Sequence, residues 1–415
     1  MTTTFSQNFT KPEFIQNPYP FYEELYTHPS ILFDTNSKSW LAFNYDDVKA
    51  VLENKLLPMG RRNPNQMDEF QWSDIFKMKD ANRKNELLQK KADLFITTAF
   101  MIDMDVHFEI KKEIMKVFTP QMLGELTQYV NQVAEEALKN YEHGQTINLK
   151  DDYIDPIVRS AVEFLFGMEK SKAKNLIDNA HYIVQKKFQY RKGLKEKLLL
   201  TKAVIYLANY TIKTAEDDNA PRGPFLGKLI SMYKNGSLNA DGLVSNTIIT
   251  MGAALESTFS SIESIFYNFH LNKNLYHLVR ADRSLSKKFI AESNRVESAV
   301  SFITRFALED TKIKGVEVKK GDTFMCLLGA ANRDPKKFTN ANGIVLDRPS
   351  DNTLIFGSGI HFCIGAAVAK IEMEIALKNF MDKFHDFEIV SKLNWRQDFR
   401  FRALEELNVK VFRNM

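Results

Sequence analysis

The sequence predicts a mainly α-helical fold with small β-sheets, organised as a single large domain over residues 1–415. The stretches 107–141, 155–215 and 241–272 are predicted as long helices. The segment KIKGVEVKKGDTFMCLL has β-branched runs divided by glycine turns, which predicts a small sheet within residues 313–328. The sequence contains no internal repeat and no linker rich in Pro, Gly or Ser, so nothing in it suggests a domain boundary.

The remaining elements follow in chain order. NPYPFYEELY begins with turn prolines and continues as a helix, SWLAFNY has strand character, and DDVKAVLEN has an Asp cap followed by helical spacing. Residues 331–350 are predicted as a loop and residues 366–382 as a helix. The tail VKVF, residues 409–412, is predicted as a strand, so the minor sheets lie near both ends of the chain.

Composition excludes several classes of protein. A net charge of +4, with acidic and basic residues mixed along the chain, is too weakly basic to predict nucleic-acid binding. No apolar run is long enough to span a membrane, and the polar start MTTTFSQNFTKPEF lacks the pattern of a signal peptide. Two cysteines in 415 residues favour a reducing compartment over a disulfide scaffold, so we expect a cytoplasmic protein.

The segment FGSGIHFCIG, residues 356–365, places Cys363 in a glycine-rich turn just before a predicted helix. Backbone amides and the helix dipole at this position stabilise an anion, which favours a thiolate. No CxxC partner supports a structural zinc site. A single thiolate held by amides suits an axial ligand to a haem iron. The alternative is a buried core cysteine beside a glycine turn.

This segment resembles the haem-binding loop F-G-x-G-x-H-x-C-x-G of the cytochrome P450 family at every fixed position. The helix that follows, AAVAKIE, also resembles the family's next helix. The resemblance implies the cytochrome P450 fold, haem b as cofactor and Cys363 as the iron ligand. Phe356, Gly357, His361 and Gly365 occupy the loop positions that surround the cofactor.

The segment AESNRVESAV resembles the family's E-x-x-R helix, with Glu292 and Arg295 on one helix face. Arg348, in LDRP, matches the third member of the same network. The resemblance implies a buried ion-pair network that holds the loop behind the cysteine. The alternative is an ordinary surface pair, which stabilises a helix by only a few tenths of a kcal/mol.

Haem carries two propionates, which need cationic or hydrogen-bonding partners. By resemblance, His361 and Arg305 occupy positions for that task, together with His107 and Lys111 on one predicted helix face. The family usually has H-x-x-x-R where this chain has Lys111, which keeps the charge but loses the bidentate fork. For His107, a solvated helix histidine is the alternative.

The helix VSNTIITMGAALEST, residues 244–258, resembles the family's oxygen-activation segment A-G-x-(D/E)-T, which begins here at Ala253. Glu256 and Ser257 then supply protons to the reacting oxygen as an acid and alcohol pair, with Thr258 as a substitute for the hydroxyl. The alternative is a hydroxyl bonded back to a helix carbonyl, with Glu256 reaching solvent. Two departures from the pattern are Ala254 for Gly and Ser257 for Thr.

The resemblance implies a monooxygenase that inserts one oxygen atom from O2 into an apolar small molecule, such as a secondary metabolite, a terpenoid or a fatty acid. Thiolate donation from Cys363 promotes O–O cleavage. Electrons come from a separate ferredoxin or flavodoxin and its reductase, because the chain has no flavin or iron–sulfur motif.

By the same analogy, several apolar side chains are candidates for the substrate pocket, and for each one core packing is an equal alternative. They are Phe70, Trp72, Phe76, Phe188, Leu255, Phe302 and Ile303. The unusually polar stretch 60–100 is a candidate for a mobile lid.

Rival functions stay open at this point. They are a haem-thiolate peroxygenase or non-redox rearrangement enzyme, and a haem sensor without turnover.

Overall fold

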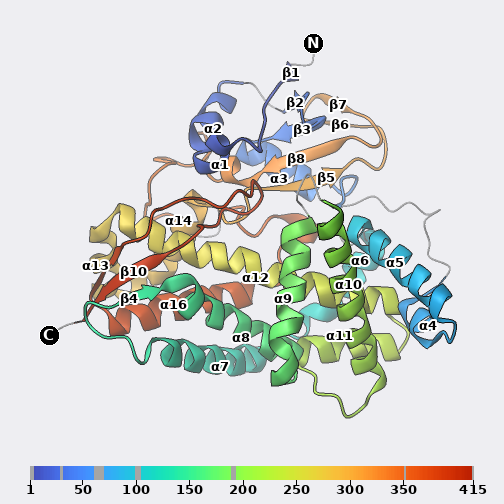
Figure 1. The fold of residues 1–415 in the computed structure, drawn as a ribbon. Coiled ribbons are helices and arrows are strands. Elements are labelled where there is room, and N and C mark those ends of the chain that lie inside the picture. The colour runs from blue at the N-terminus through green and yellow to red at the C-terminus, as the bar shows by residue number, and fades with distance from the viewer. Residues whose placement is uncertain are drawn as a thin grey trace. The chain divides into compact units, whose positions relative to one another are not determined.

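The computed structural model describes residues 4–28, 31–59, 70–98, 104–187, 193–349 and 352–413. The chain forms two compact units (Figure 1). The first contains residues 1–59, 130–157 and 257–415, and the second contains residues 60–129 and 158–256. Three helices contribute residues to both units: α7 (Pro120–Leu138), α8 (Asp155–Phe166) and α12 (Ala240–Leu271). The prediction of one domain over the whole chain stays a prediction, whereas the prediction of a mainly helical fold with small sheets is confirmed.

The first unit contains a five-stranded sheet that joins three N-terminal strands to two strands from residues 302–327. Its strand order is β1 (Thr4–Phe5), β2 (Leu32–Asp34), β3 (Ser39–Ala42), β8 (Thr323–Leu327) and β5 (Phe302–Phe306). In Figure 1 the blue strand β3 therefore lies beside the orange strand β8, with which it pairs in parallel. Strands β5 and β8 pair antiparallel, so that Ile303 lies opposite Cys326. Apolar side chains from both faces of this sheet form buried clusters.

Two smaller sheets complete the strands of the first unit. A three-stranded sheet has the order β4 (Thr146–Asn148), β10 (Asn408–Phe412) and β9 (Asp386–Ile389). A two-stranded hairpin joins β6 (Thr311–Ile313) to β7 (Val316–Val318). The predicted strands at residues 313–328 and 409–412 are confirmed, whereas β4 and β9 lie in segments that showed no clear strand pattern.

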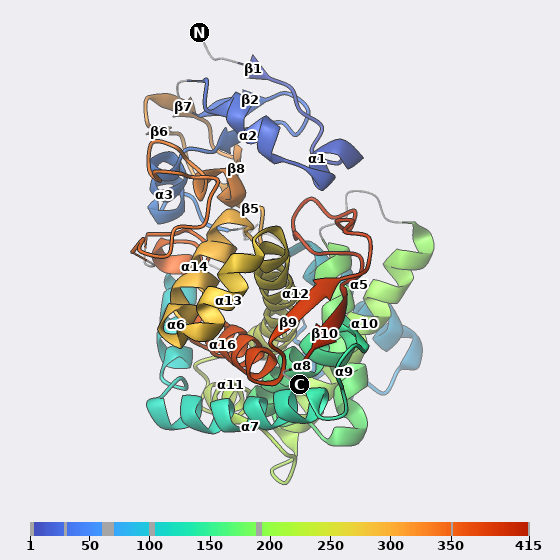
Figure 2. The ribbon, with the colours of Figure 1, turned by 90° about the vertical axis from the view of Figure 1, so that its left-hand side faces the viewer.

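Helices of the first unit pack beside these sheets, and Figure 2 shows α13, α14 and α16 grouped near β9 and β10. A π-helical turn, Leu149–Ile154, precedes α8, and short 3-10 turns span Arg283–Leu285 and Gly359–His361. The helices are α1 (Pro12–Gln16), α2 (Tyr19–Leu25), α3 (Tyr45–Glu53), α13 (Lys273–Ala281), α14 (Ser286–Val296), α15 (Leu328–Ala331) and α16 (Ala366–Lys383).

The second unit is helical in its described residues, with α4 (Trp72–Lys77), α5 (Ala81–Thr98), α6 (Met104–Met115), α9 (Lys170–Lys187), α10 (Leu194–Glu216) and α11 (Pro224–Lys234). Of the stretch proposed as a lid, residues 60–69 lie outside the described residues. Residues 70–98 contain helices α4 and α5, and the buried Lys91 of α5 links this segment to α12 through an ion pair. Its Nζ lies 2.8 Å from Asp241 Oδ2 and donates to the carbonyl of Phe70.

Two of the predicted long helices are divided, for local reasons. Stretch 107–141 breaks between Met115 and Pro120, because proline is favoured in the first turn of a helix and not in its interior. The Thr119 side chain accepts a hydrogen bond from the Met122 amide at 3.2 Å and caps the new helix. Stretch 155–215 breaks after Phe166, where Gly167 adopts a φ of +63° and ends α8.

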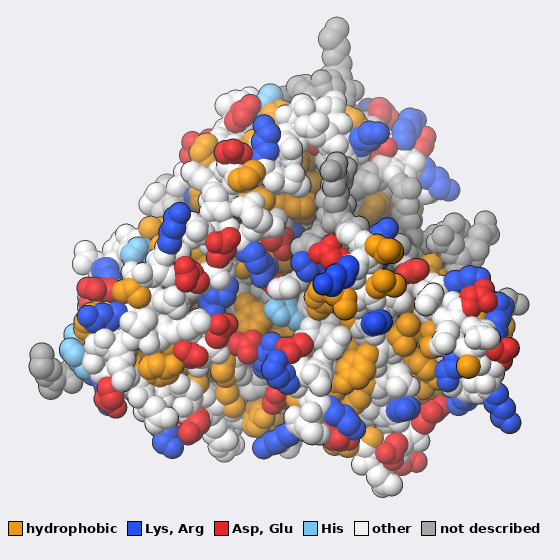
Figure 3. All heavy atoms as spheres, in the orientation of Figure 1, with side chains coloured by type: hydrophobic (Ala, Val, Ile, Leu, Met, Phe, Trp, Pro, Cys, Tyr) orange, Lys and Arg blue, Asp and Glu red, His pale blue; other side chains and the backbone are white. Residues whose placement is uncertain are grey.

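Surface charges are mixed rather than segregated. On the face drawn in Figure 3, acidic and basic side chains are interspersed. Across the described ranges, no helix combines the length and the apolar character needed to cross a membrane.

Candidate functional site

The cysteine loop lies between α15 and α16 in the first unit, and Cys363 is exposed, three residues before α16 begins. The amide of Cys363 donates to the carbonyl of Phe356 at 2.9 Å, which closes the loop. Gly359 has a φ of +69°, and a side chain there would lie 3.1 Å from the Glu53 Cα and from the Leu52 carbonyl oxygen of α3. Glycine is therefore required at this position both by conformation and by the close approach of α3.

The other loop positions are arranged around the same turn. Gly357 also has a positive φ, of +72°, and its amide donates to the Leu354 carbonyl. His361 and Phe356 are half-buried, and Lys370 Nζ lies 5.5 Å from the Phe356 ring. Gly365 is the N-cap residue of α16. The loop thus presents Cys363 at the N-terminus of a helix, where a thiolate is favoured.

The second cysteine, Cys326, is a core residue. Cys326 is fully buried in β8 and does not form a disulfide bond with Cys363. Burial raises the pKa of the Cys326 thiol to about 12, although the charge of Arg305 acts in the opposite direction. Cys326 therefore stays a thiol at neutral pH.

Glu292, Arg295 and Arg348 come together in the structure. Arg295 is fully buried and donates to both carboxylate oxygens of Glu292, at 2.7 and 2.9 Å. The Nε of Arg348 lies 3.0 Å from Glu292 Oε1, and the amide of Val345 donates to Oε2 at 2.9 Å. Burial acts to raise the pKa of Glu292, but the hydrogen bonds from Arg295 and the Val345 amide and the charges of Arg295 and Arg348 leave it below its usual value.

Arg295 links this network to the cysteine loop. Its Nη1 donates to the carbonyls of Asn332 and Ala341, at 2.9 and 2.7 Å, and its Nη2 also donates to the carbonyl of Gly343 at 2.6 Å. Together with the two hydrogen bonds to Glu292, all five guanidinium N–H groups therefore have acceptors. The Asn332 side chain in turn accepts from the Leu354 amide at 2.7 Å, just before the loop begins. The geometry is that of a buried structural network and differs from a surface ion pair.

Arg305, on β5, is a buried cation. It is 1% exposed, and its Nη1 donates to the Thr304 carbonyl at 2.9 Å. Within the part of the chain that the structure describes, its Nε has no hydrogen-bond partner and no carboxylate forms an ion pair with it. Burial lowers the pKa of Arg305, which shows that its charge is poorly compensated.

These observations fit a haem group. A buried guanidinium without a carboxylate partner is suited to one of the two propionates, which are anionic and accept bidentate hydrogen bonds. An exposed cysteine at a helix N-terminus is suited to the iron. Cys363, Arg305 and His361 all belong to the first unit.

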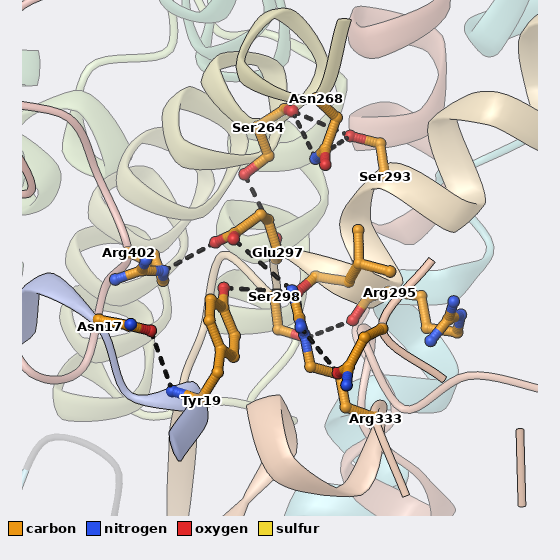
Figure 4. Close-up of polar contacts among 12 residues, drawn as sticks. Asn17, Tyr19, Ser264, Asn268, Ser293, Arg295, Glu297, Ser298, Arg333 and Arg402 are labelled. Atoms are coloured by element: carbon orange, nitrogen blue, oxygen red, sulfur yellow. Dashed lines mark hydrogen bonds and ion pairs between the residues drawn. The ribbon is translucent and has the colours of Figure 1, made fainter. Parts of the chain in front are cut away.

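Sequence reasoning missed a second buried carboxylate in the first unit, Glu297, which follows α14. Figure 4 shows it among Arg402, Arg333, Tyr19 and Ser264. Its Oε2 accepts from Arg402 Nε at 2.7 Å, and its Oε1 lies 3.7 Å from Arg333 Nη2. The guanidinium of Arg333 lies over the Tyr19 ring at 3.5 Å. The partner Arg402 is 105 residues away, so no local pattern could have revealed the pair.

Glu297 and a further buried carboxylate fix the C-terminal turn at residues 398–404. Arg402 is held by Glu297, and the amide of Leu404 donates to Glu263 Oε2 at 2.7 Å. The amide of Arg402 also donates to the Ala299 carbonyl at 2.9 Å. This turn is therefore tied to the segment that leads into β5.

Helix α12 carries the proposed oxygen-activation residues. In this otherwise largely buried part of the helix, Ala253 is exposed and Ser257, one turn later, is half-buried. Leu255 and Thr258 are buried. Ala253 and Ser257 therefore form an accessible strip, and Ser257 rather than Thr258 lies on it.

Glu256 does not reach solvent, so the alternative that we considered for it is wrong. It is 1% exposed, and its Oε1 lies 2.6 Å from His181 Nε2 and accepts a hydrogen bond from Gln185. His181 and Gln185 are four residues apart on α9, and both were missed. The signal available in the sequence was a polar pair at i, i+4 on one helix face.

The other predicted contacts in the second unit are less defined. His107 and Lys111 lie one turn apart on α6, which places them on one face of that helix. Lys111 is half-buried, whereas the side chain of His107 lies outside the described residues.

The candidate pocket residues differ in their surroundings. Trp72 is 1% exposed and stacks on Phe76 at 5.9 Å, and Phe302 is buried and stacks on Phe399 at 4.9 Å. Phe70, Phe76 and Ile303 are half-buried, Leu255 is buried, and Phe188 lies outside the described residues.

Comparison with known proteins gives one family. The model of the cytochrome P450 family matches residues 44–392, which include the cysteine loop and the Glu292 network. Cytochrome P450(BM-1) of Priestia megaterium is 27% identical over 382 residues, covering 89% of this chain and 88% of that protein. The polyketide biosynthesis cytochrome P450 PksS of Bacillus subtilis is 25% identical over 413 residues, covering 96% and 97%.

Solved structures agree on the fold. The crystal structure of CalO2 has a TM-score of 0.84 at 18% identity and covers 98% of both chains. The structure of P450BioI in complex with hexadec-9Z-enoic acid ligated acyl carrier protein has a TM-score of 0.81 at 22% identity, covering 96% of this chain and all of that one. With the family model matching most of its length, the chain belongs to the cytochrome P450 family of haem-thiolate monooxygenases.

Proposed function

We propose that this chain holds haem b through Cys363 and inserts one oxygen atom from O2 into an apolar small molecule, in the cytoplasm. Electrons come from a separate ferredoxin or flavodoxin and its reductase. The observation that carries the proposal is the loop in which Cys363 stands exposed just before α16. The same unit contains the buried Arg305, whose Nε has no hydrogen-bond partner among the described residues.

Each residue of the loop then has a role. The helix dipole and the closed backbone of the loop keep Cys363 ionised for the iron. Arg305 and His361 bind the propionates, and the family resemblance assigns the same task to His107 and Lys111. Phe356, Gly357, Gly365 and Ala253 border the cofactor. The bound haem supplies the reductive activation of O2 and the insertion of oxygen into a C–H bond.

Protons are the contribution of α12. Glu256 is buried, and Ser257 carries a hydroxyl on the accessible strip one residue later. An acid and an alcohol in neighbouring positions pass a proton inward by general acid catalysis. Thr258 is buried, and it is the substitute for the hydroxyl if Ser257 does not serve.

The substrate belongs to apolar bacterial secondary metabolites or related acyl compounds. Support comes from the names of the relatives, which include a polyketide biosynthesis enzyme and a structure with a fatty acid on an acyl carrier protein. The half-buried aromatic side chains Phe70 and Phe76 are in keeping with an apolar ligand.

The primary test is the absorption spectrum of the purified protein after reduction and addition of carbon monoxide. We expect the red-shifted Soret band of a thiolate-ligated haem, lost in Cys363→Ala and retained in Cys326→Ala. The second variant is the matched control, because it removes the other cysteine from a buried site. A histidine-type band in the intact protein would refute the proposal.

A second test addresses the reaction. Compound classes are first screened for a spin-state shift of the ferric protein. Products are then compared between a surrogate reductase pair with O2 and peroxide alone. Turnover with peroxide alone would identify a peroxygenase instead.

A further inference from the structure

Glu256 is a buried carboxylate, and two of its hydrogen-bond partners, His181 and Gln185, lie on α9. Taking a carboxylate out of water is costly unless hydrogen bonds or opposite charge compensate it. His181 Nε2 lies 2.6 Å from Glu256 Oε1, and Gln185 donates to the same oxygen. Because an ionised carboxylate only accepts hydrogen bonds, Nε2 is the ring nitrogen that carries hydrogen toward Glu256.

This contact depends on how closely α9 approaches α12. A side chain on Gly252 would lie 2.5 Å from the Ala180 carbonyl oxygen and 2.5 Å from Val184 Cγ2. Glycine is therefore needed where the two helices meet. Glu256 lies one turn after Gly252 on α12. On α9, His181 directly follows Ala180, and Gln185 directly follows Val184. The packing thus aims both side chains at the carboxylate.

His181 also lies between Glu256 and water. Its side chain is 20% exposed, whereas that of Glu256 is 1% exposed. An imidazole ring can both accept and donate a proton through its two nitrogens. A proton taken from water by His181 therefore has a hydrogen-bonded path to a carboxylate that water itself does not reach.

Several other charged groups on the described part of α9 form ion pairs of their own. Asp178 binds Arg159 of α8 at 2.7 Å and Lys174 at 2.6 Å. Lys186 lies 3.7 Å from Glu196 of α10. Glu256 of α12 is an acidic group in hydrogen-bond contact with His181.

We propose that His181 is a positioning residue that holds Glu256 and returns a proton to it from solvent. After Glu256 gives up its proton, the protonated imidazole passes the hydrogen on Nε2 to Oε1 and becomes neutral. The ring then takes a proton from water, so one proton moves inward per cycle and no electron is transferred. This inference rests on the proposed role of Glu256 as the buried acid.

The test uses variants that separate the two proposed roles of His181, the positioning of Glu256 and the supply of a proton to it. His181→Gln keeps a hydrogen-bond donor but cannot be protonated near neutral pH. Glu256→Gln removes the acid itself. His277→Gln is the matched control, because His277 is an exposed histidine on α13.

The assay is oxygen reduction by the haem-loaded protein with a surrogate ferredoxin and reductase and no added substrate, so it needs no knowledge of the natural ligand. NADH consumption and hydrogen peroxide are measured from pH 5.5 to 8.5, in H2O and D2O. The wild type should lose rate as the pH rises. His181→Gln should be about tenfold slower at pH 6, the low end of what general acids contribute, with a flat pH profile. His277→Gln should match the wild type.

A second readout is independent of activity. Thermal unfolding of His181→Gln, Glu256→Gln and the double variant forms a double-mutant cycle, and the two Tm shifts should not add if the side chains are coupled. Additive shifts, or a His181→Gln rate and pH profile equal to those of the wild type while Glu256→Gln is slow, would refute the inference. If Glu256→Gln also behaves as wild type, it is the proposed role of Glu256 that fails.

Discussion

Removal of Arg295 tests how the cysteine loop is supported. In Arg295→Ala, Glu292 keeps Arg348 and one amide but loses its two hydrogen bonds of 2.7 and 2.9 Å. Three carbonyls lose their donor as well. Breaking a buried ion pair costs about 3–5 kcal/mol, and each lost hydrogen bond adds about 0.5–1.5 kcal/mol. We therefore expect a loss of about 5 kcal/mol or more, from a typical total of about 5–15 kcal/mol.

The assay measures the haem-to-protein ratio and the Tm of the purified variants. Arg295→Ala should retain little haem and melt at a much lower temperature. Arg295→Lys should fall between it and the wild type, because it keeps the charge but loses the planar fork. Arg83→Ala is the matched control, since Arg83 pairs with Glu86 at the same spacing on the exposed surface of α5, and it should leave both quantities unchanged. Full haem content and an unchanged Tm in Arg295→Ala would refute the reasoning.

Other predictions follow from individual buried groups. Arg305→Gln should weaken haem retention without changing the thiolate band of the fraction that is loaded, as measured by haem titration. Burial raises the pKa of Glu372 well above its usual value, so the folded state binds a proton that the unfolded state releases, and stability falls as pH rises above about 4.3. Glu372→Gln should therefore raise the Tm at pH 7–8 and change it little near pH 4; an equal effect at both would contradict this. Ser257→Ala should slow product formation by a factor near the low end of about 10²–10⁴ and should lower the amount of product formed per NADH, whereas Thr258→Ala should change neither quantity. Full coupling of NADH use to product in both variants would show that neither hydroxyl is needed for proton delivery. Glu297→Ala should lower the Tm by leaving Arg402 without its carboxylate, and an unchanged Tm would show that this pair contributes nothing.

The sequence determined those features that depend on neighbours along the chain. The loop FGSGIHFCIG favours a turn, because the glycines at positions 357 and 359 adopt the positive φ angles found there without the steric cost that a side chain would add. Glu292 and Arg295 are three residues apart, so any helix places them on one face. The strand that contains Cys326 was predicted from its own composition.

Tertiary structure decided the contacts between distant segments. The sequence left two interpretations of Glu256 open, a proton relay or exposure to solvent. It could not indicate His181 as the partner, because His181 is 75 residues away and the contact depends on the close approach of α9 to α12 at Gly252. The same is true of Glu297 with Arg402, and of the path from Arg295 through Asn332 to the cysteine loop. Local spacing fixes which face of a helix a side chain occupies, whereas the packing of helices and sheets fixes what that face meets. Burial, which sets the protonation of Cys326 and Glu372, is a property of that packing and not of the local sequence.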